Sequence, residues 1–340
     1  MHDQYPAVTL HNVAELAGPE WTDEGTELRR VPAAVADELN VAARDRVRHP
    51  AGSEIRFVPD RGETVRVTLS AGGETAVREF WGSFQDADVH ELGPDPVTLE
   101  LSMPDALADL DSEAAPDAAD GFDPRVCRLR FEPWAPVALH GVRGDCRPPE
   151  PGAVPATRYL AYGTSITEGA AASATHLTYV SRVARDLGLD PVNLGMSGSA
   201  YCEPAAARYI AARDDWDVAT LALSVNMANR GFTVEQFRER AAALLSTVAE
   251  AHPDSPVACV TLFPYHADLR TGGDRERARA YREALESVVA DCPAENVALV
   301  DGSELTAATG LSTDLLHPGD AGMEAIADGI GSRLRSLLTD

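Results

Sequence analysis

The stretch from Tyr159 to Thr167, YLAYGTSIT, changes character at its glycine and decides how the second half of the chain is interpreted. Its first residues are apolar, as in a short strand buried on both faces of a sheet. Gly163 allows a sharp turn off that strand, and the residues after it can begin a helix. The stretch therefore predicts the first β–α junction of a parallel sheet, with the hydroxyl of Ser165 at the junction.

The same alternation continues to the end of the chain. Short apolar runs predict further strands at residues 191–194, 218–225, 257–263 and 297–300. Between and after them, helices are expected at residues 177–187, 233–251, 274–290 and 321–338. Thr233 and Gln236 form a capping box at the start of the second of these helices. Five strands alternating with helices predict an α/β domain over residues 158–340, with a parallel sheet covered by helices on both faces.

The first 147 residues have a different pattern. Apolar and polar residues alternate at 65–69, 97–103 and 128–131, with Gly, Pro and Asp between the runs, which predicts an antiparallel β-sandwich. Residues 104–123 are rich in Ala and Asp and are expected to form an acidic surface loop with at most one helical turn. Residues 148–157 are rich in proline and predict a stiff linker between domains 1–147 and 158–340.

The charge balance is unusual, with 54 Asp and Glu against 29 Arg and no Lys, a formal net charge of −25. Such a surface excludes nucleic acid and anionic membrane as partners. It suits a high-salt cytoplasm, so a halophilic protein is expected, although a mesophilic protein from a GC-rich genome remains an alternative.

No apolar run reaches the ~18–20 residues of a membrane helix, and the N-terminus lacks the pattern of a signal peptide, which predicts a cytoplasmic location. The five cysteines form no CxxC pair and are interpreted as free thiols.

Residues that could carry chemistry follow the predicted strands. In open α/β sheets, ligands bind beyond the carboxyl ends of the strands. Ser165, Gly198, Asn226 and the pair Asp314–His317 all fall at that edge. The sequence therefore brings a nucleophile, a base, a carboxylate and polar donors to one edge, and these are the parts that acyl transfer requires.

Three of these residues have the types of a catalytic triad. A serine hydroxyl is a poor nucleophile unless a base accepts its proton, and His317 is a suitable base on a loop. Asp314 is three residues earlier and can hold the imidazole through Nδ1, which leaves Nε2 for the serine. Taken singly, Ser165 or Thr164 could be a helix N-cap, and His317 and Asp314 could be a solvated surface pair.

The developing oxyanion of a tetrahedral intermediate needs donors aimed at it. The backbone N–H groups of Ser165 and Gly198 and the side-chain amide of Asn226 are suitable. Each alone is also consistent with an ordinary turn residue. The interpretation depends on all of them falling at one edge in the required order.

At these residues the sequence resembles the SGNH, or GDSL-type, hydrolase family. Gly163-Thr164-Ser165 stands where that family has Gly-Asp-Ser, and residues 193–198 resemble its glycine block. Asn226 matches the oxyanion asparagine, although residues 224–227 read Ser-Val-Asn-Met where many members read Gly-x-Asn-Asp. Asp314 and His317 match the Asp-x-x-His block. The resemblance implies a flavodoxin-like three-layer fold, no metal or organic cofactor, and, by similarity to a two-domain subgroup, a jelly-roll-like N-terminal sandwich.

The expected function is a serine hydrolase that cleaves carboxylic esters of a small molecule or glycan through an acyl-enzyme on Ser165. Short acyl groups, including sugar O-acetyl groups, are favoured by the resemblance. An acyltransferase with the same triad and a non-catalytic carbohydrate-binding protein are the alternatives. The N-terminal domain could bind glycan, cover the active-site edge or form a dimer, and the sequence leaves the oligomeric state open.

Overall fold

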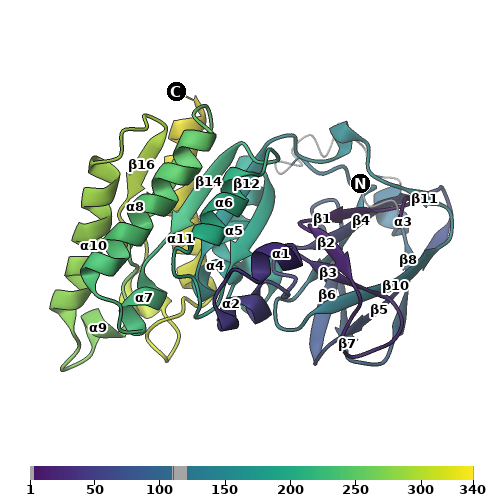
Figure 1. Ribbon diagram of the computed structural model, residues 1–340. Coiled ribbons are helices and arrows are strands. Elements are labelled where there is room, and N and C mark those ends of the chain that lie inside the picture. Colours follow the sequence, from purple (N-terminus) through teal and green to yellow (C-terminus); the bar gives the residue numbers. More distant parts are fainter. Residues whose placement is uncertain (1–3, 109, 111–120, 340) are drawn as a thin grey trace. The chain divides into compact units, whose positions relative to one another are not determined.

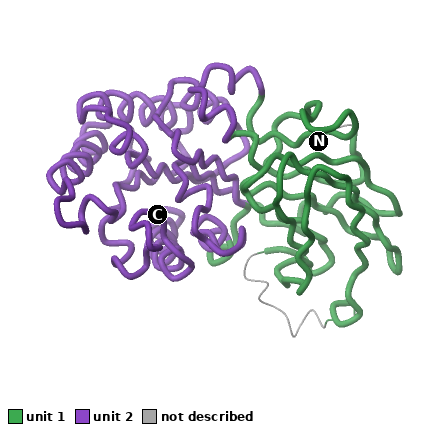
Figure 2. The backbone as a smooth tube through the Cα atoms, turned by 90° about the horizontal axis from the view of Figure 1, so that it is seen from below, with its two compact units in different colours: residues 1–32, 47–156, 185–190 green, residues 33–46, 157–184, 191–340 purple. Residues whose placement is uncertain are grey.

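The computed structural model describes residues 4–108, 110 and 121–339, which form two compact units (Figures 1 and 2). Unit 1 consists of the chain up to Pro32, Val47–Ala156 and Arg185–Asp190. Unit 2 consists of Ala33–Arg46, Thr157–Ala184 and the chain from Pro191 onward. The linear division into 1–147, a linker at 148–157 and 158–340 stays a prediction. Each unit also includes a short segment from the other part of the chain.

Unit 1 is built from two antiparallel sheets. The first has the order β1-β4-β9-β6-β7, with β11 paired to β4. Its strands are β1 (Thr9–His11), β4 (Glu54–Pro59), β6 (Thr75–Trp81), β7 (Phe84–Leu92), β9 (Cys127–Phe131) and β11 (Cys146–Arg147). The second has the order β2-β3-β10-β5-β8. Its strands are β2 (Glu15–Ala17), β3 (Thr26–Arg29), β5 (Thr64–Ala71), β8 (Val97–Ser102) and β10 (Val137–Arg143).

The core of unit 1 follows from the alternation in the sequence. On β5, Val65, Val67 and Leu69 are fully buried, whereas Arg66 is exposed. They pack in one cluster with apolar residues of the other sheet, among them Phe57 and Leu129. The predicted antiparallel β region is thereby confirmed. The predicted acidic loop at 104–123 begins with the short helix α3 (Asp105–Ala108), and its residues 109 and 111–120 lie outside the described part.

A cluster of charged side chains is buried in unit 1. Glu54 forms ion pairs with Arg56, Arg128 and Arg130, and Arg56 binds both carboxylate oxygens of Asp190 at 2.9 and 2.7 Å. Burial alone would raise the pKa of Glu54, but the three guanidinium groups outweigh it and hold that pKa well below its usual range. Asp190 shows the same direction, because burial is outweighed by the charge of Arg56. These carboxylates are therefore kept ionised in the interior by their partners.

Unit 2 contains a five-stranded parallel sheet with the order β13-β12-β14-β15-β16. Its strands are β12 (Arg158–Gly163), β13 (Asp190–Gly195), β14 (Val218–Ala222), β15 (Val257–Val260) and β16 (Val297–Val300). In chain order the strands lie as 2-1-3-4-5, the order of flavodoxin-like folds. The predicted α/β class and parallel sheet are confirmed.

Helices cover both faces of this sheet. One group consists of α6 (Pro204–Ala211), α8 (Val234–Ala251) and α10 (Arg275–Ala290), which pack against one another in front of the sheet in Figure 1. The other group consists of α5 (Tyr179–Leu187) and α11 (Asp320–Thr339), which are joined by an ion pair between Arg182 and Glu324. With this strand order, the right-handed connections that parallel strands favour put α5 on one face of the sheet and α6, α8 and α10 on the other. The predicted capping box of α8 is present, with both Thr233–Gln236 hydrogen bonds formed.

Two strands are shorter than their apolar runs predict. The run 218–225 continues as strand only to Ala222, and Val225 already belongs to helix α7 (Val225–Asn229). The break occurs because Ser224 has a φ of 100°, a conformation that ends a strand. Similarly, β15 ends at Val260 rather than at Phe263. After each of these two strands, the chain leaves the sheet at the edge where the candidate site residues lie.

Candidate active site

Ser165 is the first residue of the short helix α4 (Ser165–Glu168), directly after β12. Thr164 is the N-cap of this helix, and its hydroxyl accepts the N–H of Ile166. A Cβ on Gly163 would lie 2.2 Å from Oγ1 of Thr167 and 2.9 Å from the carbonyl oxygen of Ala222, so only glycine fits at this turn. The tight junction predicted from the sequence thus fixes Ser165 at the carboxyl end of β12.

His317 reaches Ser165 across 152 positions of the sequence. Its Nε2 lies 2.8 Å from Oγ of Ser165, and its Nδ1 lies 2.6 Å from Oδ2 of Asp314. The turn that carries Asp314 and His317 has Leu315 at a φ of 55°, which lets the Asp314 carboxylate fold back onto the imidazole. The structure therefore brings the three predicted residues into one hydrogen-bonded row.

The carboxylate of Asp314 accepts four hydrogen bonds. Besides the imidazole, it accepts the N–H groups of Leu316 and His317 and the hydroxyl of Ser312, at 2.8, 3.0 and 2.8 Å. Partial burial alone would raise the pKa of Asp314, but these hydrogen bonds outweigh it and hold the pKa well below its usual range.

The ionisation of Asp314 fixes the imidazole tautomer. An ionised carboxylate only accepts, so Nδ1 of His317 carries the proton that it donates to Asp314. In the neutral ring Nε2 is then an acceptor for the hydroxyl of Ser165. This arrangement is what general-base activation of a serine requires.

Asn226, on α7, is held in one orientation by the loop after β13. Its Oδ1 accepts the N–H of Ala200 at 3.1 Å. With Oδ1 bound to the loop, Nδ2 is the donor that remains, and no acceptor binds this nitrogen among the residues that the structure describes. Asn226 is only 7% exposed, so a substrate oxygen would meet this donor in a largely dry position.

Gly198 lies in the same loop, with a φ of 67°, where a side chain would be strained. Its carbonyl accepts the hydroxyl of Tyr201 at 3.0 Å, which orients the peptide group between Gly198 and Ser199. Gly198 and Asn226 are thus linked through the short segment between residues 198 and 200. The structure therefore places Gly198 in this loop and binds the side chain of Asn226 to it.

Glu168 fastens this loop to the helix of the nucleophile, which the sequence did not predict. It is 1% exposed, and its Oε2 accepts the N–H of Ser197 at 2.7 Å. A Cβ on Gly195 would lie only 2.3 Å from the backbone nitrogen of Glu168, so the loop and α4 are in direct backbone contact. Glu168 follows Ser165 by three positions, about one helical turn, and this spacing could have indicated that the two side chains lie on the same side of α4.

Asn40 holds the same loop from a segment early in the chain. It directly precedes helix α2 (Val41–Arg46) within unit 2, and its Oδ1 accepts the N–H of Ala43. Its Nδ2 donates to the carbonyl of Ser199 at 2.9 Å and to the carboxylate of Glu203 at 3.0 Å. No local pattern reveals partners about 160 positions away, so sequence reasoning had no signal for this contact beyond a plausible N-cap.

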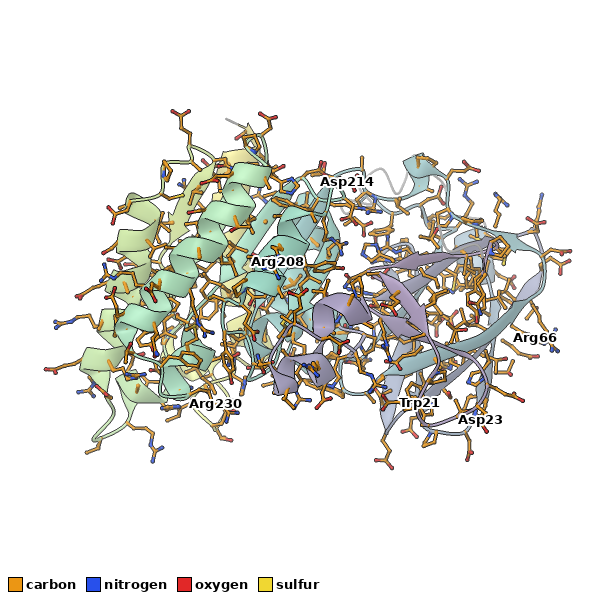
Figure 3. All side chains as sticks on the ribbon, viewed as in Figure 1. Trp21, Asp23, Arg66, Arg208, Asp214 and Arg230 are labelled. Atoms are coloured by element: carbon orange, nitrogen blue, oxygen red, sulfur yellow. The ribbon has the colours of Figure 1, made fainter. Side chains whose placement is uncertain are left out.

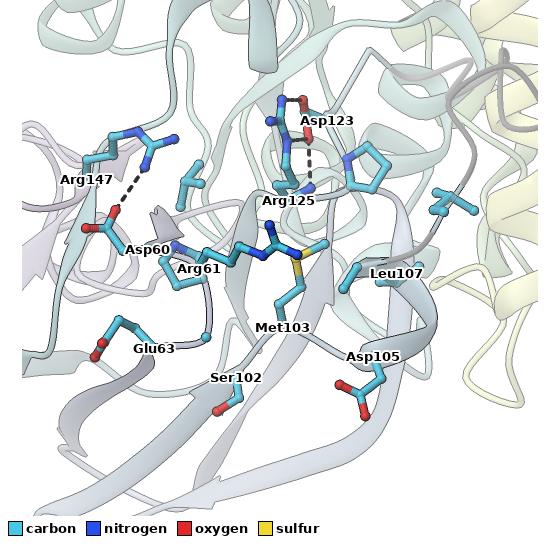
Figure 4. Close-up of a pocket in the computed structure, with 16 residues that line it drawn as sticks. Asp60, Arg61, Glu63, Ser102, Met103, Asp105, Leu107, Asp123, Arg125 and Arg147 are labelled. Atoms are coloured by element: carbon cyan, nitrogen blue, oxygen red, sulfur yellow. Dashed lines mark hydrogen bonds and ion pairs between the residues drawn. The ribbon is translucent and has the colours of Figure 1, made fainter.

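A cavity of about 1120 Å³ lies in unit 1 and is lined by residues between Val58 and Arg147 (Figure 4). Two pairs of its charged side chains bind each other: Arg147 donates to Asp60 at 3.1 Å, and Arg125 binds Asp123. It contains none of the predicted site residues. Within the described ranges, no helix has the length and apolar character needed to cross a membrane.

Residues 161–325 match the model of the GDSL-like lipase/acylhydrolase family. This part of the chain is therefore a GDSL-like lipase/acylhydrolase domain, as the SGNH resemblance predicted. The match to this family supports an enzyme that acts on esters. The sequence matches no curated protein.

Solved structures with the same fold extend over nearly the whole chain. A salicylyl-acyltransferase, SsfX3, from a tetracycline biosynthetic pathway has a TM-score of 0.74 at 17% identity and covers 98% of this chain and 95% of its own. A putative GDSL-like lipase from Bacteroides ovatus has a TM-score of 0.68 at 18% identity, with 98% of both chains covered. A family two carbohydrate esterase from Clostridium thermocellum has a TM-score of 0.64 at 16% identity, covering 98% and 99%. At such identities the likeness establishes the fold alone.

Proposed function

We propose that this protein is a serine hydrolase that cleaves carboxylic esters through an acyl-enzyme on Ser165. The observation that carries the proposal is the continuous hydrogen-bonded row from Ser165 through His317 to Asp314, with distances of 2.8 and 2.6 Å. These distances are already those of a nucleophile with its base in place.

The mechanism follows from the donors and acceptors of the site. Oγ of Ser165 attacks the ester carbonyl carbon while Nε2 of His317 takes the hydroxyl proton. Asp314 orients the ring and stabilises the imidazolium that forms. The backbone N–H groups of Ser165 and Gly198 and Nδ2 of Asn226 donate to the oxyanion.

The acyl-enzyme then forms and breaks by the same proton transfers. His317 returns its proton to the alcohol oxygen as the C–O bond of the ester breaks, which leaves the acyl group on Ser165. Water, deprotonated by His317, attacks this acyl-enzyme. The carboxylic acid is released and Oγ of Ser165 regains its proton.

Short acyl groups on carbohydrates are the substrates that we propose first. Neighbours of this fold include a carbohydrate esterase, and the shared two-part architecture over 98% of the chain supports this choice. An acyltransferase with the same residues is the second candidate, because the neighbour with a TM-score of 0.74 is a salicylyl-acyltransferase. In that reaction an alcohol or amine takes the place of water.

The experiment that tests the proposal is hydrolysis of p-nitrophenyl esters of increasing acyl length, at high and low salt, by the wild type and by Ser165→Ala. We expect acetate to be cleaved and the variant to lose several orders of magnitude in kcat. Dependence of activity on high salt would support a halophilic protein. Undiminished esterase activity in Ser165→Ala would refute the assignment, whereas an acyl product formed only with an added acceptor would favour the acyltransferase.

A further inference from the structure

Arg230 lies beside the loop that carries the proposed oxyanion donor Gly198. A Cβ placed on Gly198 would be 3.7 Å from Nη2 of Arg230, closer than any other atom outside its chain neighbours. Arg230 follows Asn226 by four positions and is the C-cap of α7, so the two side chains lie on the same side of this short helix. Figure 3 shows Arg230 just below α7. The guanidinium is therefore adjacent to the place where the reacting carbonyl would lie.

This guanidinium is exposed, and within the described residues it forms no hydrogen bond or ion pair. The chain has 54 acidic residues against 29 arginines, so a competing carboxylate would be easy to supply, yet none binds Arg230 among the described residues. The neighbouring Arg240, by comparison, lies over the ring of Phe232 and donates to the carbonyl of Tyr201. Arg230 thus keeps its N–H donors available on the side of Gly198.

We propose that Arg230 is a specificity-determining residue that binds a carboxylate carried by the substrate close to the scissile ester. This inference rests on the proposed esterase function. The planar fork of a guanidinium matches the two oxygens of a carboxylate, and the pair is stronger than a neutral hydrogen bond. The net charge of −25 opposes anions at long range, but salt screens that repulsion, whereas a contact pair at Arg230 is screened less. The preferred substrates are then acidic esters.

The test compares pairs of esters that differ only in charge. For a carboxylate on the acyl side, the pair is monoethyl succinate and ethyl succinamate. For a carboxylate on the alcohol side, it is 4-acetoxybenzoate and 4-acetoxybenzamide. Within each pair the shapes are nearly identical, so the ratio of kcat/KM for the acid to that for the amide isolates the contribution of the charge.

We expect Arg230→Gln to lower this ratio about threefold to fivefold in at least one pair, the size of a partly exposed charge pair. The responding pair identifies the side of the ester that carries the carboxylate. The matched control is Arg335→Gln, which removes another exposed arginine of unit 2 about 22 Å along α11 from its start, and which should leave both ratios unchanged.

The outcomes separate this inference from the function on which it rests. Hydrolysis of the amide esters with the same ratios in wild type and Arg230→Gln would overturn the role of Arg230 alone. Failure of the folded wild type to cleave p-nitrophenyl acetate as well as these four esters would overturn the proposed function together with this inference. Cleavage of p-nitrophenyl acetate but of none of the four would overturn this inference alone. An equal fall of the ratios in Arg335→Gln would show a long-range charge effect and would also overturn it.

Discussion

The contact of Asn40 with the loop of Gly198 allows a demanding test of how the site is positioned. Asn40→Ala removes the N-cap of α2 and both side-chain donations, to Ser199 and Glu203. The cap is worth about 1 kcal/mol. The bond to the Ser199 carbonyl is worth about 1 kcal/mol and that to the Glu203 carboxylate about 1.5–3 kcal/mol. Because such terms overlap and the site is only partly buried, we expect a loss of about 3 kcal/mol in the free energy of unfolding.

The expected effect on activity is smaller than the loss of a donor. Removing an oxyanion donor lowers kcat by about 10²–10³. In Asn40→Ala the N–H of Gly198 remains, but its loop is less firmly held, so we expect kcat to fall about tenfold with KM nearly unchanged. The assay is p-nitrophenyl acetate hydrolysis under saturating substrate, with urea unfolding followed by circular dichroism on the same samples.

A second substitution separates the two roles of Asn40. Asn40→Asp keeps an oxygen that can cap α2 but has no Nδ2 to donate, so it should be as slow as Asn40→Ala. Val41→Ser, at a neighbouring side chain that is 77% exposed, should match the wild type in rate and stability. Full kcat in Asn40→Asp, or in a destabilised Asn40→Ala, would refute the positioning argument and leave Asn40 as a helix cap only.

Three further predictions concern other parts of the chain. Asp314→Asn should lower kcat on acetate by about 10²–10⁴, because the amide no longer fixes the tautomer of His317, and a variant within threefold of the wild type would contradict this. Ser224→Gly should raise the free energy of unfolding by about 1 kcal/mol in urea titrations, because it relieves a φ of 100°; equal or lower stability would show that no strain is stored there. Asp190→Asn should cost about 3 kcal/mol at pH 7 and flatten the loss of stability on acidification. Because the pKa of Asp190 is lowered by folding, its ionised form contributes stability above pH about 4, and this stability is lost as the pH falls further. Urea midpoints that change with pH in parallel in the variant and the wild type would contradict this role of Asp190.

Much of unit 2 was accessible to sequence reasoning because its signals are local. The junction at Gly163 and Ser165, the capping box of α8 and the apolar strands all depend on neighbours within a few positions. Their order along the chain, combined with the rule that sites lie at the carboxyl ends of strands, predicted which residues meet. The row from Ser165 to His317 was predicted in this way, although its residues are 152 positions apart.

The parts that sequence reasoning missed depend on long-range packing. The end of β14 at Ala222 is set by the backbone of Ser224, a residue with no intrinsic tendency toward positive φ. Asn40 contacts a loop about 160 positions later in the sequence, at Ser199 and Glu203. The role proposed for Arg230 depends on its distance from Gly198 and on the absence of a competing carboxylate among the described residues, and neither can be read from composition.

The interleaved make-up of the two units has a consequence for synthesis on the ribosome. Unit 1 includes Arg185–Asp190, whose last residue pairs with Arg56 in the buried charged cluster. At about 5–20 residues per second, Arg56 is made several seconds before its carboxylate partner is available. Until then Arg56 has Glu54 but lacks Asp190, the second of its two carboxylate partners inside the forming core. The N-terminal part of the nascent chain therefore cannot complete its fold as it emerges, and it must wait for a segment encoded well inside the hydrolase domain.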